Sequence, residues 1–354
     1  MSMTRSEHPP TAGVPARPSG PRAVIARRPV TAFVVLVLTF AYPLMALPIL
    51  AFRDVIPGRG LLEMLPIAPD ETAGLLLTLG ALLPATLIVT WSVGGGEGVR
   101  RLFRRLAHWR IGIGWWVAIF TALPALTTGL AVLLGDQPKP VNVIQLFATQ
   151  AWLLLANLVF TNLWEELAWS GVMQTQLEQR HNVFVAALIT MVPFALVHEP
   201  LRLFTGEFTL ISVAVGLALY LLFGLFFRPM LAVVLRGTRD SVLAVAVLHS
   251  VFNRSVNDNG IAASLVDGET RGLTMLIAVA VVTLTVSVIF RRRLTRAYRR
   301  ELDAVPVQHV DDREPARCPR ADPRLDASDP WTVRGVDAFP ASGRERVESR
   351  TTGP

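Results

Sequence analysis

Residues 208–227 read FTLISVAVGLALYLLFGLFF and contain no charged side chain. A helix rises 1.5 Å per residue, so about 20 apolar residues cross a bilayer core about 30 Å thick. This run therefore predicts a transmembrane helix. Runs of the same character predict further spans, at 30–52, 72–93, 113–134, 145–166, 183–199, 240–254 and 272–290. The expected fold class is all-α, a polytopic membrane protein with about eight transmembrane helices.

The composition of the whole chain agrees with this class. Of 354 residues, 52% are hydrophobic and 17% are charged, whereas a soluble domain carries about 25% charged residues. Residues 1–29 and 291–354 are basic and poor in apolar residues, so they predict a disordered N-terminal segment and a basic flank with a disordered tail. The membrane domain is expected at 30–290. Cys318, the single cysteine, lies in the tail, which excludes a disulfide framework.

The net charge of +7 comes from arginines that flank the apolar runs. They cluster in alternate connections and beside both ends of the membrane domain, so the positive-inside rule predicts that both termini are cytoplasmic. An even number of spans requires the same. Arginines in this arrangement report membrane orientation, so no nucleic-acid partner is expected, and the plasma membrane is the expected location. The arginines assigned to this side include Arg100, Arg101, Arg104, Arg105, Arg228, Arg236 and Arg239.

The fourth span has a polar continuation. Residues 145–177 could form one uninterrupted helix, which is longer than one bilayer crossing. Residues 171–179 are polar enough to leave the membrane core. We therefore expect this last part to bend into an interfacial segment.

Strongly polar residues inside the membrane spans occur at three places. Ionisable groups there cost at least ~2.5 kcal/mol each, so they are functional candidates. The first place is Glu165 and Glu166 within NLWEELAWSG, the second is His198 at the end of MVPFALVH, and the third is His249 with Asn253 within AVLHSVFN.

These three places are expected at one depth in the membrane. The fourth and fifth spans turn near 180–182; Glu165 lies 15 residues before this turn and His198 lies 16 residues after it. In an antiparallel hairpin the two side chains reach the same level. His249 lies nine residues into the seventh span, which enters from the same side. Polar residues with unrelated structural roles would not be expected to lie at the same depth in the membrane.

Glutamate, histidine and asparagine in this combination favour hydrolysis. A buried glutamate can act as a general base on water, with a histidine that holds the water or shares the proton. A second histidine and an asparagine four residues later can stabilise an oxyanion. No Ser-His-Asp pattern or buried cysteine is present, so water is the expected nucleophile.

At these residues the chain resembles the CPBP family, which contains the type II CAAX prenyl endopeptidases, the abortive-infection proteins and immunity proteins similar to lysostaphin resistance protein A. The family pattern is EExxxR, then FxxxH, then HxxxN or HxxxD, each on a membrane helix. This chain has EELAWSG at 165–171, FALVH at 194–198 and HSVFN at 249–253. The resemblance is specific over 160–254, within an expected core of about 145–255.

The resemblance implies an intramembrane glutamic endopeptidase that hydrolyses a peptide bond of a membrane-associated protein, prenylated CAAX substrates being one family-level option. By resemblance, Glu165 activates water together with His198. His249 and Asn253 stabilise the oxyanion, and Glu166 supports them. The expected partners are this substrate and the lipid bilayer, while the oligomeric state is open.

One position departs from the family pattern. Ser170 stands where the family has arginine. Without that arginine, Glu166 is expected to lose its nearest counter-charge, and to be protonated or hydrogen-bonded to the Ser170 hydroxyl. The alternative function is therefore a catalytically degenerate scaffold or an immunity-type protein. A transporter or proton relay is a third reading, but the sequence shows no inverted repeat or broken-helix pair.

A zinc-protease motif is incomplete in this chain. His198 and Glu199 begin an HExxH string, but Arg202 stands where the second histidine should be. No obligatory metal or other cofactor is expected. If a divalent metal binds, the expected ligands are Glu165, His198 and His249.

Overall fold

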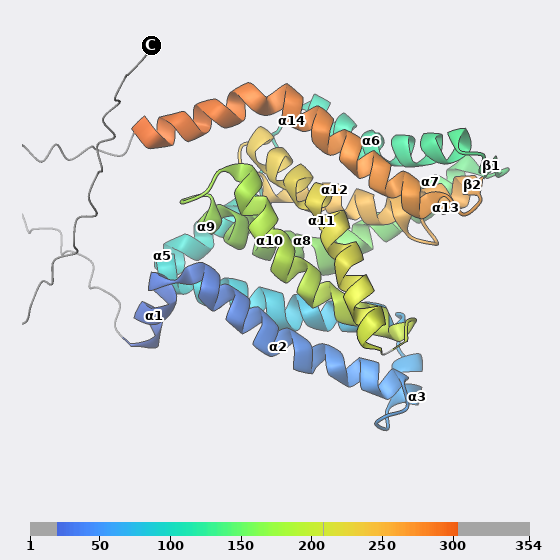
Figure 1. The fold of residues 1–354 in the computed structure, drawn as a ribbon, viewed down its shortest axis with the longest axis horizontal. Helices are drawn as coiled ribbons and strands as arrows, with labels where there is room; N and C mark the ends of the chain where they lie inside the picture. The colour runs from blue at the N-terminus through green and yellow to red at the C-terminus, as the bar shows by residue number, and fades with distance from the viewer. Residues whose placement is uncertain (1–19, 208, 304–354) are drawn as a thin grey trace, which may run out of the picture. The chain divides into compact units, whose positions relative to one another are not determined.

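The computed structural model describes residues 20–207 and 209–303, with side chains described up to residue 290, and within these limits it is almost entirely helical (Figure 1). The only strands there are β1 (Gln137–Pro138) and β2 (Val266–Asp267), which pair antiparallel. The helices are α1 (Pro21–Arg27), α2 (Pro29–Phe52), α3 (Arg59–Glu63), α4 (Pro69–Leu75), α5 (Leu83–Leu106), α6 (Ile113–Leu133), α7 (Val143–Asn157), α8 (Leu163–Ala168), α9 (Thr175–Leu177), α10 (Val183–His198), α11 (Leu210–Gly237), α12 (Val242–Val256), α13 (Ile261–Leu265) and α14 (Arg271–Asp303). Three π segments, η1 (Leu76–Leu82), η2 (Leu158–Asn162) and η3 (Trp169–Gln174), and one 3₁₀ segment, η4 (Glu199–Phe204), join neighbouring helices.

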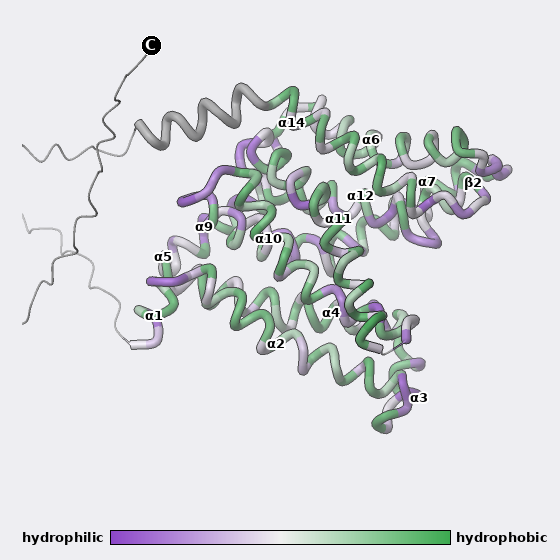
Figure 2. The backbone as a smooth tube through the Cα atoms, viewed as in Figure 1, coloured by the Kyte–Doolittle hydropathy of each residue, from purple (hydrophilic) through white to green (hydrophobic). Residues whose placement is uncertain are grey.

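In the described part of the chain, seven helical stretches are long and apolar enough to cross a membrane. They are Pro29–Phe52, Pro69–Leu106, Ile113–Leu133, Val143–Leu177, Val183–Phe204, Leu210–Gly237 and Arg271–Phe290. Many of their apolar side chains face outward, among them Ile144, Phe147, Trp152 and Ile211, as lipid-facing residues do. Figure 2 shows hydrophobic residues along the helices and hydrophilic ones mainly at connections such as those around α3, α9 and β2. The chain is thus an all-α polytopic membrane protein.

The seventh expected span, 240–254, differs from the others. It forms α12, whose 15 residues extend about 22 Å, less than the bilayer core. Most of its residues are buried, and it contacts α6, α7, α8 and α11. The apolar run at 240–254 therefore reflects burial inside the protein. The orientation of the termini, which lie outside the described residues, stays a prediction. Because the described residues contain seven candidate spans, it rests on the distribution of arginines and no longer on an even number of spans.

Three boundaries differ from the sequence prediction. The second span continues from Pro69 to Leu106 with a kink at Gly95, where φ is 59°, a backbone angle that glycine adopts easily. The sixth span does not end at 227, since α11 continues to Gly237. Part of the segment 1–29 is helical, because Pro21–Arg27 forms α1. The remaining predictions for 1–19 and for 304–354 lie outside the described residues.

The first half of the segment 171–179 packs inside the protein, while its position relative to the membrane core stays a prediction. All six residues of η3, Trp169–Gln174, are buried inside the helical unit. Arg105 of α5 donates hydrogen bonds to the Gly171 carbonyl at 2.8 Å and to Thr175 Oγ1 at 3.2 Å. Protein neighbours thus satisfy the Gly171 carbonyl and the Thr175 hydroxyl, as buried polar groups require.

Candidate active site

Two capping side chains fix the start of the helices that carry the histidines. Asn182 Oδ1 accepts a hydrogen bond from the Val185 amide at 3.0 Å, and α10 then runs to its last residue, His198. Ser241 Oγ accepts one from the Ala244 amide at 3.1 Å, which places His249 in the middle of α12. Such caps satisfy amides that would otherwise lack partners and contribute about 1 kcal/mol each. The local sequence thus sets the depth of both histidines.

The two glutamates lie on α8, a short helix with a π segment on each side, η2 before it and η3 after it. π segments are rare and occur frequently at functional sites. Both carboxylates are buried, Glu165 with 4% and Glu166 with 0% of its surface exposed. They face α10, α11 and α12, where their polar partners lie.

Glu165 pairs with His198. The distance from Glu165 Oε1 to His198 Nε2 is 3.0 Å. His198 Nδ1 lies 2.7 Å from the Phe194 carbonyl, which can only accept, so Nδ1 carries a hydrogen. Nε2 faces a carboxylate that also accepts, so the pair shares one further proton. Among the described residues, none donates a hydrogen bond to Glu165 Oε2, which lies 3.9 Å from His249 Nδ1.

Glu166 has partners on both oxygens. Its Oε1 lies 3.0 Å from Arg228 Nη1 and 2.9 Å from His249 Nδ1. Its Oε2 accepts a hydrogen bond from the Ser170 hydroxyl and lies 3.3 Å from Arg228 Nη1. Adjacent carboxylates therefore have different environments, one fully engaged and one with a free oxygen.

The expectation that Glu166 loses its counter-charge is wrong. Arg228, which we had assigned to a cytoplasmic flank, is fully buried on α11 and forms an ion pair with Glu166. Arg228 Nη2 also donates to Ser170 Oγ at 3.3 Å. The expected hydrogen bond between Ser170 and Glu166 is present. A cation from a distant part of the sequence thus occupies the place beside Glu166.

Aromatic rings hold the two histidines. The Phe194 ring lies against His198, with centroids 4.1 Å apart, and also near His249, at 6.5 Å. The Phe227 ring meets His249 edge-on at 5.0 Å. The FxxxH spacing therefore has a packing role, because residues four apart share a helix face.

Asn253 belongs to a group of three amides. Its Nδ2 donates to Asn157 Oδ1 at 3.2 Å and lies 3.5 Å from Asn162 Oδ1. Asn162 is fully buried, and its Nδ2 has no hydrogen-bond partner among the described residues. Asn162 lies three residues before Glu165, on the same helix face. A buried amide donor is thus available beside the glutamates.

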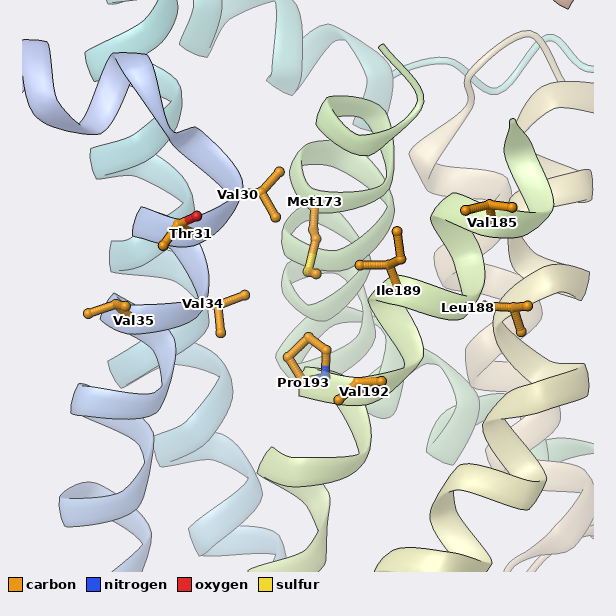
Figure 3. Close-up of a pocket in the computed structure, with 10 residues that line it drawn as sticks. All are labelled: Val30, Thr31, Val34, Val35, Met173, Val185, Leu188, Ile189, Val192 and Pro193. Atoms are coloured by element: carbon orange, nitrogen blue, oxygen red, sulfur yellow. The ribbon is translucent and has the colours of Figure 1, made fainter. Parts of the chain in front are cut away.

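An apolar groove lies beside the site. It has a volume of ≈ 630 Å³ and runs between α2 and α10, with Met173 of η3 as part of its lining (Figure 3). Pro193 borders it, and the next residue is Phe194, which contacts His198. The groove therefore comes close to the polar cluster along α10. Its lining residues are Val30, Thr31, Val34, Val35, Met173, Val185, Leu188, Ile189, Val192 and Pro193.

Contacts join four of the five residues predicted from the sequence: Glu165, Glu166, His198 and His249. The fifth, Asn253, lies one turn after His249 on α12, and its side chain contacts Asn157 and Asn162 instead. The sequence analysis missed Arg228, Asn157 and Asn162. Arg228 could have been noticed, since apolar residues stand on both sides of it in LFGLFFRPMLAVVL. Within the part of the chain that the structure describes, no group of three carboxylate, histidine or cysteine side chains is arranged to hold a metal ion.

The fold and the site together define an integral membrane protein with a buried Glu/His/Asn cluster at the meeting point of three helices. Residues 145–255 match the family model of the Rce1-like proteins, described as type II CAAX prenyl endopeptidase Rce1-like. The matched segment contains all three sequence blocks and confirms the resemblance to the CPBP and CAAX-protease family. Comparison with curated proteins gives no match.

Proposed function

We propose that this protein is an intramembrane endopeptidase that hydrolyses a peptide bond of a membrane-associated protein or peptide. The observation that carries the proposal is the pairing of Glu165 with His198, which leaves Glu165 Oε2 without a hydrogen bond from the described residues. An unengaged carboxylate oxygen beside a histidine is what a general base for water requires. The family match over 145–255 supports a peptidase.

In the proposed reaction, Glu165 Oε2 takes a proton from water as the water oxygen attacks the scissile carbonyl carbon. The pair of Glu165 and His198 already shares one proton, and it holds two after this step. One of them passes to the leaving nitrogen as the C–N bond breaks. The pair returns to its starting protonation state, so the cycle consumes water and yields a carboxylic acid and an amine.

His249 and the amides are proposed to stabilise the oxyanion. The Nδ1 atom of His249 donates to Glu166, which fixes the ring orientation and leaves Nε2 for the substrate. Nε2 can donate only when the ring is protonated. Asn253 adds its amide, and the unpartnered Nδ2 of buried Asn162 offers a further donor. Donors held in place in a water-poor site stabilise developing charge strongly.

The degenerate-scaffold alternative rested on Ser170. Arg228 provides a buried cation 3.0 Å from Glu166, so the missing arginine does not leave that carboxylate alone. This contact favours the enzyme over the scaffold. The groove between α2 and α10 is proposed to receive apolar side chains or a lipid-like group of the substrate, since its lining is almost wholly apolar. The plasma membrane stays the proposed location.

The mechanism needs no metal ion, because each step above uses only protein groups and water. His198 Nδ1 is engaged by the Phe194 carbonyl and Nε2 by Glu165, and His249 Nδ1 is engaged by Glu166. A metal-free site is therefore part of the proposal. Incubation with a chelator is the corresponding test, and we expect unchanged cleavage.

The test of the function is cleavage by the purified protein in liposomes. A panel of transmembrane peptides, with and without a prenyl group, is incubated with wild-type protein and with Glu165→Gln, and products are identified by mass spectrometry. We expect cleavage of at least one peptide by the wild type and none by the variant. Equal cleavage by both proteins would refute the proposal.

A further inference from the structure

We propose that Arg228 is a positioning residue that supplies, from α11, the positive charge that the site requires beside Glu166, and that through Glu166 it holds the imidazole of His249. The charge relation is independent of the proposed function, whereas its effect on turnover rests on that function. Arg228 contacts neither His249 nor Glu165 among the hydrogen bonds of the described residues, so its action passes through Glu166.

Arg228 makes its side-chain hydrogen bonds to two neighbouring residues of one helical segment, Glu166 of α8 and Ser170 of η3. Nη1 lies within 3.3 Å of both Glu166 oxygens, and Nη2 lies 3.3 Å from the Ser170 hydroxyl. That hydroxyl itself donates to Glu166. Arg228 and Glu166 are both fully buried. A buried charge without a partner is strongly destabilising, so the two residues depend on each other.

The positive charge of Arg228 is needed all the more because a second carboxylate, that of Glu165, lies beside Glu166. Glu165 and Glu166 are consecutive, and His249 Nδ1 lies 3.9 Å from an oxygen of the first and 2.9 Å from an oxygen of the second. Two carboxylates that share a buried site disfavour each other's ionised form. A guanidinium on Glu166 offsets this repulsion, and Glu166 can then accept the Nδ1 hydrogen of His249.

The small residue at position 170 creates the room that Arg228 occupies. Ser170 has no exposed surface, and its hydroxyl is one of the two groups that the guanidinium contacts. The guanidinium lies over the Phe194 ring, with Cζ 5.4 Å from the ring centroid, a favourable cation–π distance. One turn before Arg228 along α11, Gly224 allows a close approach to Met191 of α10. The serine at 170 and the arginine at 228 therefore form one arrangement, in which α11 carries the positive charge beside Glu166.

The test places the arginine at position 170 in place of position 228. The proteins compared are the wild type, Arg228→Ser, Ser170→Arg, the relocated double variant Ser170→Arg/Arg228→Ser, and the neutral pair Glu166→Leu/Arg228→Met. Arg236→Met is the matched control, because Arg236 lies on the same helix but pairs with Glu178 and Asp240. Three quantities are measured: the thermal unfolding midpoint, the ¹⁵N shifts of the His249 imidazole, and kcat and KM for a peptide that the wild type cleaves.

We expect Arg228→Ser and Ser170→Arg each to lower the unfolding midpoint, the first by leaving Glu166 alone and the second by burying two cations together. The relocated double variant has an unfolding midpoint close to that of the wild type. The His249 shifts report a hydrogen fixed on Nδ1 in the wild type and in the relocated variant, and a mixture of tautomers in Arg228→Ser. The neutral pair recovers the unfolding midpoint but not the wild-type ¹⁵N shifts of His249. This result distinguishes a role of Arg228 in orienting His249 from a role in stability alone.

For turnover we expect Arg228→Ser to lower kcat by about 100-fold with little change in KM, as a misplaced catalytic group does. The relocated variant recovers kcat, and Arg236→Met leaves it unchanged. The proposal is overturned if Arg228→Ser keeps the wild-type His249 shifts, or if the double variant is no better than its two parents in midpoint and shifts. If the wild type cleaves nothing, the proposed function fails, while the midpoints and the shifts still decide the role of Arg228.

Discussion

Glu165 and Glu166 are consecutive in the sequence, but only Glu165 keeps a carboxylate oxygen without a hydrogen bond from the described residues. Glu166 is engaged on both oxygens by Arg228, Ser170 and His249. Two neighbouring carboxylates with such different surroundings are suited to different roles.

Glu165→Gln is expected to abolish peptide cleavage, with a loss of about 100- to 10,000-fold, because the amide keeps the size of the side chain but cannot accept a proton from water. The unfolding midpoint should change little. The measurement is the initial rate of peptide cleavage in liposomes. Glu199→Gln is the control, since Glu199 is also buried but lies outside the polar cluster. Cleavage retained in Glu165→Gln would assign the base to another residue.

Glu166→Ala is expected to lower the free energy of unfolding by about 3–5 kcal/mol, because it leaves the guanidinium of Arg228 buried without a counter-charge. Glu63→Ala is the matched control. It removes an ion pair with Arg59 in which both side chains are about half exposed, and it should cost less than about 1 kcal/mol. Unfolding in a denaturing detergent, followed by tryptophan fluorescence, gives both values. Similar losses in the two variants would contradict the buried ion pair.

Asn162→Ala is expected to lower kcat by about 10- to 1,000-fold if its unpartnered amide serves the oxyanion together with Asn253. KM should change less than kcat, because the interaction forms in the transition state. Asn142→Ala is the control; this asparagine only caps α7. A rise in KM with unchanged kcat would instead place Asn162 in ground-state substrate binding.

Ile189→Trp is expected to fill the groove between α2 and α10 (Figure 3) and to raise KM for membrane peptides, with kcat largely unchanged, because Ile189 lines the groove and is not one of the proposed catalytic residues. Ile211→Trp is the control, an equally large change at a lipid-facing position of α11 outside the groove. The measurement is the dependence of rate on the mole fraction of peptide in the liposome. Equal KM values in the two variants would exclude the groove as the substrate path.

Gly224→Ala is expected to destabilise the protein by about 1–3 kcal/mol, because a Cβ atom there would lie 2.6 Å from Met191 Cγ and would separate α10 from α11. The same change at Gly129 of α6, where a Cβ would meet nothing within 4 Å, should be neutral or stabilising, since alanine favours a helix. The comparison of the two unfolding midpoints checks this. A larger loss in Gly129→Ala would contradict the close helix approach.

The sequence alone determined the fold class and predicted that Glu165, Glu166, His198 and His249 of the candidate site lie together. Apolar runs of about 20 residues predict spans because the bilayer has a fixed thickness and every backbone polar group within it needs a partner. The depth of Glu165, His198 and His249 followed from counting residues along helices of constant rise, and the three side chains do meet. Caps such as Asn182 and Ser241, which set these helix starts, are local in sequence.

Only the tertiary structure decided which charges compensate one another. Arg228 is 62 positions away from Glu166, and a positive residue after an apolar run is equally consistent with a cytoplasmic flank. The same holds for α12, whose apolar run fits lipid or protein surroundings equally well. Burial and ion pairing depend on which helix faces meet, and that is determined by packing between distant segments, which residue spacing along one segment does not encode.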